Sequence, residues 1–424
     1  MKLPRFLSTL LVIGLALVWL TGATHAQDAA TVSSLGFSPE RLQRLDAVMQ
    51  ESVAKKEIAG GIMYIARNGQ IVKLQAYGMQ DIENGKPMQT DAIFRIASMS
   101  KAVTTVAIMM LYEEGRFMLK DPVSKYIPAF ANSVVAVPPP AGSASEAKYV
   151  TVPLKRPIQI RDLLTHTAGL TYGDGLAKED YKKANLTGWY FANRSETIGE
   201  AMNRLATLPL HGQPGEAFQY GYATDVLGYL VEVVSGMPLD KFVEERICGP
   251  LKMKDTCFFL PPEKVSRFTN LYGYENGKLV LKEKASTSDY VQGPRKCFSG
   301  GAGLLSTAND YGRLLQMLLN GGELDGVRLL APKTVELMHQ NHVGNKFSGE
   351  GDGFGLGFWV KGDVGNCGEI GSEGAYGWGS AYYPQYLVDP KEKLVMFFMT
   401  QLMPAGSYTL NQRFKVLTYQ ALIK

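Results

Sequence analysis

Segments with the character of β-strands lie near both ends of the chain, and helical patterns occupy the stretch between them. The four clearest strand segments are 60–67, 70–77, 381–388 and 394–401. The first two are joined by Asn68-Gly69, a strong signal for a two-residue hairpin, and the last two flank the turn residues Asp389-Pro390. Because strands must find partners, this arrangement predicts one antiparallel sheet built from both ends of the chain.

Helices are predicted around this sheet and throughout the middle of the chain. Apolar residues recur at helical spacing in the segments 39–56, 98–114, 218–235 and 410–422. The first segment follows Ser38, and serine is a favoured N-cap before a proline at the first helical position. The pattern predicts an α+β protein in which residues 37–120 and 300–424 form a sheet domain flanked by helices. Residues 121–299 are predicted to form an inserted all-helical domain.

The first 26 residues have the layout of a secretory signal peptide. Lys2 and Arg5 precede an apolar stretch, and small residues end at Ala26, where cleavage is expected. An uncleaved membrane anchor is the rival interpretation, but the apolar stretch 6–20 is shorter than the ~20 residues that span a bilayer. No later stretch is long and apolar enough to span a membrane. The mature protein is therefore expected to be periplasmic or secreted, without an integral membrane segment.

Composition argues against several other classes of protein. The 44 Lys and Arg residues nearly balance the 40 Asp and Glu residues, so a dedicated nucleic-acid-binding protein is not expected. The sequence contains neither a His-Glu-x-x-His nor a Cys-x-x-Cys motif, and no metal or other cofactor is expected. Exported proteins can form disulfides, and the sequence leaves three full pairings open among Cys248, Cys257, Cys297 and Cys367.

A serine followed three residues later by a lysine, the Ser-x-x-Lys pattern of one class of serine nucleophile, occurs three times. The pairs are Ser52-Lys55, Ser98-Lys101 and Ser145-Lys148. Ser52 is near the end of an exposed amphipathic helix, and Ser145 is in a loop that cannot hold a fixed geometry. Ser98 begins an apolar helix directly after a short strand-like segment. Context therefore favours the pair Ser98-Lys101.

The predicted position of Ser98 has chemical consequences. Residues three apart share a helix face, so Lys101 is expected beside the Ser98 hydroxyl. The helix N-terminus stabilises negative charge on the serine, and apolar surroundings help a lysine to accept a proton. The competing interpretation is structural, with Ser98 as an N-cap and Lys101 extending to solvent. The Gly-x-Ser-x-Gly segment of α/β-hydrolases is absent, which disfavours a Ser-His-Asp triad.

Ser98-Met99-Ser100-Lys101 and four further segments resemble landmarks of the serine β-lactamase and penicillin-binding protein superfamily, in the same order along the chain. The further segments are 163–170, 214–216, 300–307 and 353–358. The chain is most similar to family VIII carboxylesterases and class C β-lactamases, from about residue 37 to the C-terminus. This resemblance implies a β-lactamase/transpeptidase-like fold, with the active site between the sheet and the helical domain.

The second motif of the superfamily, Tyr-x-Asn, matches Tyr220-Gly221-Tyr222. The resemblance implies that the Tyr220 hydroxyl lies against Ser98 and Lys101 and takes part in proton transfer. Tyr222 stands in place of the asparagine that contacts the substrate in β-lactamases, a departure common in family VIII esterases, and is predicted to bind substrate. Tyr172 is predicted to line the acyl pocket.

Trp378-Gly379-Ser380 stands where β-lactamases have Lys-Thr-Gly and family VIII esterases often have Trp-Gly-Gly. Loss of the lysine removes a cation that would pair with a β-lactam carboxylate, whereas Trp378 offers an apolar wall. Gly379 would let a substrate approach the strand closely, and Ser380 is predicted to bind substrate beside it. By resemblance, the backbone N–H groups of Ser98 and Ala381 would form the oxyanion hole.

These features predict an exported serine hydrolase, a carboxylesterase of the family VIII type that cleaves short-chain esters through an acyl-enzyme on Ser98. The alternative within the superfamily is a class C-like β-lactamase or a D-amino-acid peptidase. The alternative outside enzymes is a binding protein that has lost catalysis, which the joint presence of Ser98, Lys101 and Tyr220 disfavours. The expected partner is a small ester or amide, while its acyl chain and the oligomeric state stay open.

Overall fold

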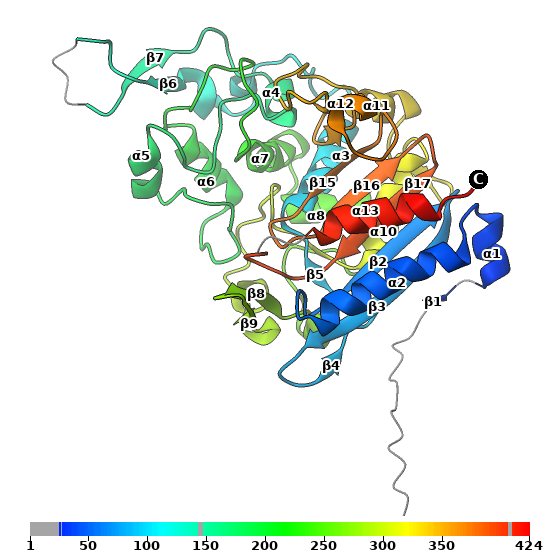
Figure 1. The fold of residues 1–424 in the computed structure, drawn as a ribbon. Coiled ribbons are helices and arrows are strands. Elements are labelled where there is room, and N and C mark those ends of the chain that lie inside the picture. The colour runs from blue at the N-terminus through cyan, green and yellow to red at the C-terminus, as the bar shows by residue number, and fades with distance from the viewer. Residues whose placement is uncertain (1–24, 27, 143–146, 406–408) are drawn as a thin grey trace, which may run out of the picture.

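The computed structural model describes residues 25–26, 28–142, 147–405 and 409–424 of the chain. Figure 1 shows a sheet with helices on both faces and a group of further helices to one side. Apart from His25–Ala26, the predicted signal peptide lies outside the described residues. Within the described ranges, no helix is long and apolar enough to cross a membrane.

The central sheet joins both ends of the chain, which confirms the predicted fold class. Its strands lie in the antiparallel order β1-β3-β2-β17-β16-β15-β14-β13, and β4 pairs with β3. Their bounds are β1 (His25–Ala26), β2 (Gly60–Arg67), β3 (Gln70–Asp81), β4 (Lys86–Pro87), β13 (Gly353–Phe354), β14 (Trp359–Val360), β15 (Tyr376–Gly379), β16 (Gln385–Asp389) and β17 (Leu394–Met399). Asn68 and Gly69 adopt φ of 52° and 77° between β2 and β3, as a type I′ hairpin requires. Strand β2 pairs directly with β17.

Helices pack on both faces of the sheet. Helices α2 (Pro39–Ala54) and α13 (Leu410–Ala421) lie side by side over one face (Figure 1). Helix α10 (Ala308–Leu319) packs against β2, β16 and β17 from the other face. Successive side chains of β17 point to opposite faces of the sheet. Phe397 stacks on Tyr64 on one face, with ring centroids 4.6 Å apart, and Phe398 packs on the other face in the cluster beneath α2 and α13.

The stretch predicted to be all-helical also contains strands, so that detail of the prediction is wrong. Its helices are α4 (Ile160–Leu164), α5 (Lys178–Lys183), α6 (Ile198–Leu205), α7 (Ala223–Ser235), α8 (Leu239–Val243) and α9 (Asp289–Gln292). Two hairpins accompany them, β6 (Val134–Val137) with β7 (Val150–Pro153) and β8 (Leu271–Glu275) with β9 (Lys278–Glu283). The second hairpin turns at Asn276-Gly277, where both residues have positive φ.

The remaining elements of the described chain are short, except for the helix that follows the candidate nucleophile. They are α1 (Ala29–Ser34), α3 (Ser100–Glu113), β5 (Phe94–Arg95), β10 (Leu305–Ser306), β11 (Glu323–Leu324), β12 (Val327–Arg328), α11 (Pro332–Met338) and α12 (Val364–Cys367), with short 3₁₀ and π turns between. Helix α3 is almost entirely buried and packs against α7 and α8. It thus connects the sheet core to the helical region.

The predicted strand 381–388 begins later than expected. Strand β15 ends at Gly379, a turn follows, and β16 starts at Gln385. The turn is closed by the Ser380 N–H, which donates to the Pro384 carbonyl at 2.8 Å, and Tyr383 takes a positive φ of 82° within it. Ala381 therefore lies in a turn, and Trp378 lies inside a strand rather than before one.

Candidate active site

Ser98 lies in a single 3₁₀ turn, Ala97–Met99, that leads directly into α3. The preceding residue, Ala97, has a backbone φ of 38°, which residues other than glycine rarely adopt. Such strain is often found where a backbone must hold a functional side chain. Ser98 is half-buried and lines a cavity of about 770 Å³. The hydroxyl is therefore both fixed by the helix start and accessible to a small molecule.

The Lys101 amine is buried against Ser98. Its Nζ donates hydrogen bonds to Ser98 Oγ at 3.2 Å, to Tyr172 Oη at 3.2 Å and to the Gly301 carbonyl at 2.9 Å. These three contacts hold the Nζ atom in place beside the Ser98 hydroxyl. Only 1% of Lys101 is exposed, so the side chain does not extend to solvent as the structural interpretation would require.

Asp225 organises the far side of this lysine, a role that the sequence did not reveal. The Asp225 carboxylate is fully buried and accepts hydrogen bonds from Ser299 Oγ at 2.5 Å and from the Gly301 N–H at 3.0 Å. It thereby holds the loop whose carbonyl binds Lys101. Burial raises the pKa of Asp225, while the Ser299 hydrogen bond and the Lys101 charge oppose that rise. A carboxylate among the buried residues of the first turn of α7 is the signal that could have identified it.

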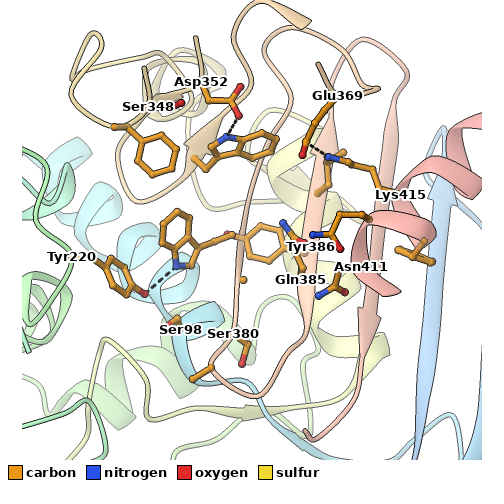
Figure 2. Close-up of a pocket in the computed structure, with 18 of the residues that line it drawn as sticks. Ser98, Tyr220, Ser348, Asp352, Glu369, Ser380, Gln385, Tyr386, Asn411 and Lys415 are labelled. Carbon is orange, nitrogen blue, oxygen red and sulfur yellow. Dashed lines mark hydrogen bonds and ion pairs between the residues drawn. The ribbon is translucent and has the colours of Figure 1, made fainter. Parts of the chain in front are cut away.

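Tyr220 lies beside Lys101 but contacts it through its ring. The Lys101 Nζ is 4.6 Å from the Tyr220 ring centroid, and Trp378 Nε1 donates to the Tyr220 hydroxyl at 3.0 Å (Figure 2). Among the described residues, no hydrogen bond joins Tyr220 to Ser98, so the expected direct contact is not present in this structure. Tyr220 precedes α7, which begins at Ala223, five residues later than the predicted helix.

Tyr172 is the phenol that contacts the lysine directly. It lines the cavity, as predicted, and also accepts the hydrogen bond from Lys101. Burial raises the pKa of Tyr172 well above its ordinary value, and the nearby Tyr220 and Asp225 raise it further. Tyr172 therefore stays a neutral phenol at neutral pH. Tyr172 contacts both Lys101 and Tyr220, because its ring also packs edge-on against the Tyr220 ring, with centroids 5.7 Å apart.

Tyr222 is not positioned to touch a ligand, and its predicted role in substrate binding is wrong. The side chain is fully buried and does not line the cavity. Its hydroxyl donates to the Gly188 carbonyl at 2.7 Å, and its ring packs edge-on against Tyr172 and Phe191. Because the residue points into the helical region, Tyr222 supports Tyr172 from behind.

The third predicted segment forms one wall of the cavity. Trp378, Gly379, Ser380 and Ala381 all line it. On β15, strand β14 pairs only with Tyr376 and Gly377, so β14 leaves the β15 edge unpaired from Trp378 onward. The Ala381 N–H has no hydrogen-bond partner in the described part of the chain. A free donor at this place is consistent with an oxyanion hole of Ser98 and Ala381, which stays a prediction.

The structure does not support a catalytic role for the rival serine Ser52 or for the nearby His166. Ser52 is fully buried in α2, and Lys55 is exposed and paired with Glu51. Ser145 lies outside the described residues. His166 is buried beside Tyr220, with ring centroids 4.8 Å apart, and its ring nitrogens have no hydrogen-bond partner among the described residues. Burial and the Lys101 charge lower the pKa of His166 well below its usual value, which keeps the ring neutral.

Neither a metal-binding cluster nor a disulfide is found among the described residues. Across the ranges that the structure covers, no group of three or more His, Cys, Asp or Glu side chains could hold a metal ion. Cys248, Cys257, Cys297 and Cys367 are all unpaired in the structure.

A cavity-lining serine that accepts a hydrogen bond from a buried lysine one helical turn away is the arrangement of a serine hydrolase of the Ser-x-x-Lys type. Comparison with known families agrees, since the model for the beta-lactamase family matches residues 45–420. The chain belongs to the beta-lactamase family.

The individual relatives include a protein that is named as an esterase. Esterase EstB of Burkholderia gladioli is 31% identical over 392 residues, covering 88% of this chain and 94% of the relative. Protein Rv1367c of Mycobacterium tuberculosis is 34% identical over 362 residues, covering 82% and 86%. Among solved structures, EstCE1, described as a hydrolase with promiscuous acyltransferase activity, superposes with a TM-score of 0.78 at 27% identity, covering 92% of this chain and 100% of EstCE1.

Proposed function

We propose that this protein is a carboxylesterase that hydrolyses short-chain esters through an acyl-enzyme on Ser98. The observation that carries the proposal is the Ser98–Lys101 hydrogen bond at the wall of a cavity where Trp378 replaces a lysine. An indole offers surface to an uncharged group and no cation for a carboxylate. The similarity to esterase EstB supports the same substrate class.

The proposed reaction uses the residues around Lys101 in sequence. Ser98 Oγ forms a bond to the ester carbonyl carbon as its proton passes to the Lys101/Tyr220 pair. The backbone N–H groups of Ser98 and Ala381 bind the oxyanion. The carbon–alkoxy bond then breaks, and the alcohol leaves with a proton returned through Tyr220. A water molecule repeats these steps on the acyl-enzyme, releasing the acid and the free serine.

Ester turnover is expected to exceed β-lactam turnover on the same protein. We expect kcat/KM for p-nitrophenyl butyrate to be at least about tenfold above that for nitrocefin, since a missing charged contact is worth ~1.5–3 kcal/mol. A D-alanyl peptide is expected to be a poor substrate as well. The measurement is a panel of p-nitrophenyl acetate, p-nitrophenyl butyrate, nitrocefin and the peptide. Strong nitrocefin hydrolysis with negligible ester cleavage would reverse this assignment, and binding without any turnover would indicate a binding protein.

We also propose that residues 1–26 direct export and are removed. Support comes from the basic residues Lys2 and Arg5, the apolar stretch behind them and the small residues up to Ala26. Cleavage there would remove β1, the two-residue strand at the sheet edge beside β3. In a bacterial host, we expect N-terminal sequencing of the periplasmic fraction to begin at Gln27. Full-length protein starting at Met1 and confined to the cytoplasm would contradict export.

A further inference from the structure

The cavity beside Ser98 continues past the end of β15 to helix α13. Its part nearest the nucleophile is lined by Tyr172, Trp189, Phe347 and Trp378, and we name this part the aromatic lobe. Its other part is lined by Trp359, Glu369, Gln385, Asn411, Gln412 and Lys415, and we name this part the α13 lobe. Figure 2 shows Ser98 and Tyr220 on one side of the cavity and Asn411 and Lys415 on the other.

The passage between the two lobes is formed by small residues. Gly379, Ser380 and Ala381 line the cavity where β15 ends. A methyl group built on Gly379 would meet nothing closer than the Pro384 carbonyl oxygen, at 3.6 Å. Strand β14 has already stopped pairing at Gly377, so no neighbouring strand covers this edge. A ligand bound at Ser98 can therefore extend into the α13 lobe.

The charges of the α13 lobe are matched in pairs. Lys415 forms a close ion pair with Glu369 (Figure 2), and the buried Lys361 lies 3.5 Å from Asp352 and 3.7 Å from Glu369. The hydrogen bond from Lys415 lowers the pKa of Glu369, so this carboxylate is ionised at neutral pH. An ionic ligand would have to break these pairs, whereas a neutral ligand would not.

The amide groups of the lobe remain available to a neutral polar ligand. Asn411 lines the lobe, and its Nδ2 donates one hydrogen to the Tyr383 carbonyl at 2.8 Å, which leaves its second hydrogen for a ligand. Gln385 and Gln412 are exposed and add further donors and acceptors. Trp359 supplies an aromatic surface beside them.

We propose that the α13 lobe binds the alcohol part of the substrate as a neutral polyhydroxy group, so that the preferred substrates are acylated sugars or polyols. The inference rests on the proposed esterase function. The acyl chain occupies the aromatic lobe, and the hydroxyl groups of the alcohol, which both donate and accept, bind the amides of Asn411, Gln412 and Gln385. Cleavage transfers the acyl group to Ser98 Oγ and releases the sugar with the proton on its hydroxyl oxygen.

The test compares two butyrate esters whose alcohols carry a six-membered ring, one with hydroxyl groups and one without. Methyl 6-O-butyryl-glucoside and cyclohexylmethyl butyrate carry six-membered rings of similar size, and titration of released butyric acid measures both. Each kcat/KM is divided by the rate constant for alkaline hydrolysis of the same ester. We expect the corrected ratio, glucoside over cyclohexylmethyl ester, to be about tenfold or more, because two or more hydrogen bonds distinguish the substrates.

Matched variants locate the effect. Gln412→Ala and Asn411→Ala are each expected to lower the ratio about three- to tenfold, whereas Gln43→Ala, an exposed glutamine on α2, leaves it unchanged. Thermal unfolding of each variant verifies that it is folded. A wild-type ratio near one, or a high ratio that neither α13 variant changes, overturns the inference while ester turnover persists. No turnover of either ester would instead overturn the proposed function and the inference with it.

Discussion

Replacing Ser98 with alanine is expected to lower kcat for p-nitrophenyl butyrate by roughly 10⁴-fold or more. Removing a catalytic nucleophile leaves only the contribution of binding and of oxyanion stabilisation. The fold should be retained, because Ser98 is half-buried and its hydroxyl is not the only acceptor for Lys101, which also binds Tyr172 and Gly301. Steady-state kinetics and thermal unfolding on the same preparation measure the two effects separately.

Ser52→Ala is the matched control for this substitution. Ser52 also stands three residues before a lysine, yet its hydroxyl is buried in α2 without a hydrogen-bond partner in the described structure. We expect kcat within about twofold of the wild type, since surface and interior changes away from the site act on stability rather than on chemistry. Activity that survives Ser98→Ala but disappears in Ser52→Ala or Ser145→Ala would show that Ser98-Lys101 is not the catalytic pair.

Removing the Lys101 amine is expected to cost about as much as removing the serine. In Lys101→Ala the Ser98 hydroxyl loses its hydrogen-bond donor, and both Tyr172 and the Gly301 carbonyl lose theirs. Parts of one catalytic unit act non-additively, so the double variant Ser98→Ala/Lys101→Ala should be no slower than either single variant. The measurement is kcat/KM for all three variants with p-nitrophenyl butyrate.

Lys101→Ala should also destabilise the protein. Its loss leaves the buried Asp225 carboxylate without the nearby positive charge that opposes the rise of its pKa. It also removes the donor that the buried Lys101 amine gives to the Gly301 carbonyl, and an unsatisfied buried polar group costs ~1–3 kcal/mol. Lys101→Arg keeps the charge but cannot act as a base, so it should restore part of the stability and none of the activity. Substantial ester turnover by a folded Lys101→Ala protein would contradict the assigned role of the amine.

Much of the fold follows from local patterns that the sequence shows directly. The Asn68-Gly69 hairpin and the strands near both ends were predictable because period-two alternation and turn residues act over a few positions. The second Asn-Gly hairpin, at Asn276-Gly277, was overlooked although it carries the same signal. The turn between β15 and β16 was missed because its strand-like residues hide a break that Pro384 and the positive φ of Tyr383 create.

The site was predictable where its parts are close in sequence. Ser98 and Lys101 share one turn at a helix start, so their contact follows from helix geometry. The contacts of Lys101 with Tyr172 and of Asp225 with Gly301 join positions 71 and 76 residues apart, which only tertiary packing brings together. Tyr222 was misjudged because a motif fixes where a residue lies along the chain, and the packing around α7 decides that its side chain points inward.

The central claim is that Ser98 is the residue that becomes acylated. Treating the purified protein with a fluorophosphonate ester, which forms a stable adduct with an activated serine, and mapping the adduct by peptide mass spectrometry tests this most directly. One phosphonate per chain on the peptide that contains Ser98, absent from Ser98→Ala, is the predicted result. Labelling of a different serine, or equal labelling of the wild type and Ser98→Ala, would contradict it.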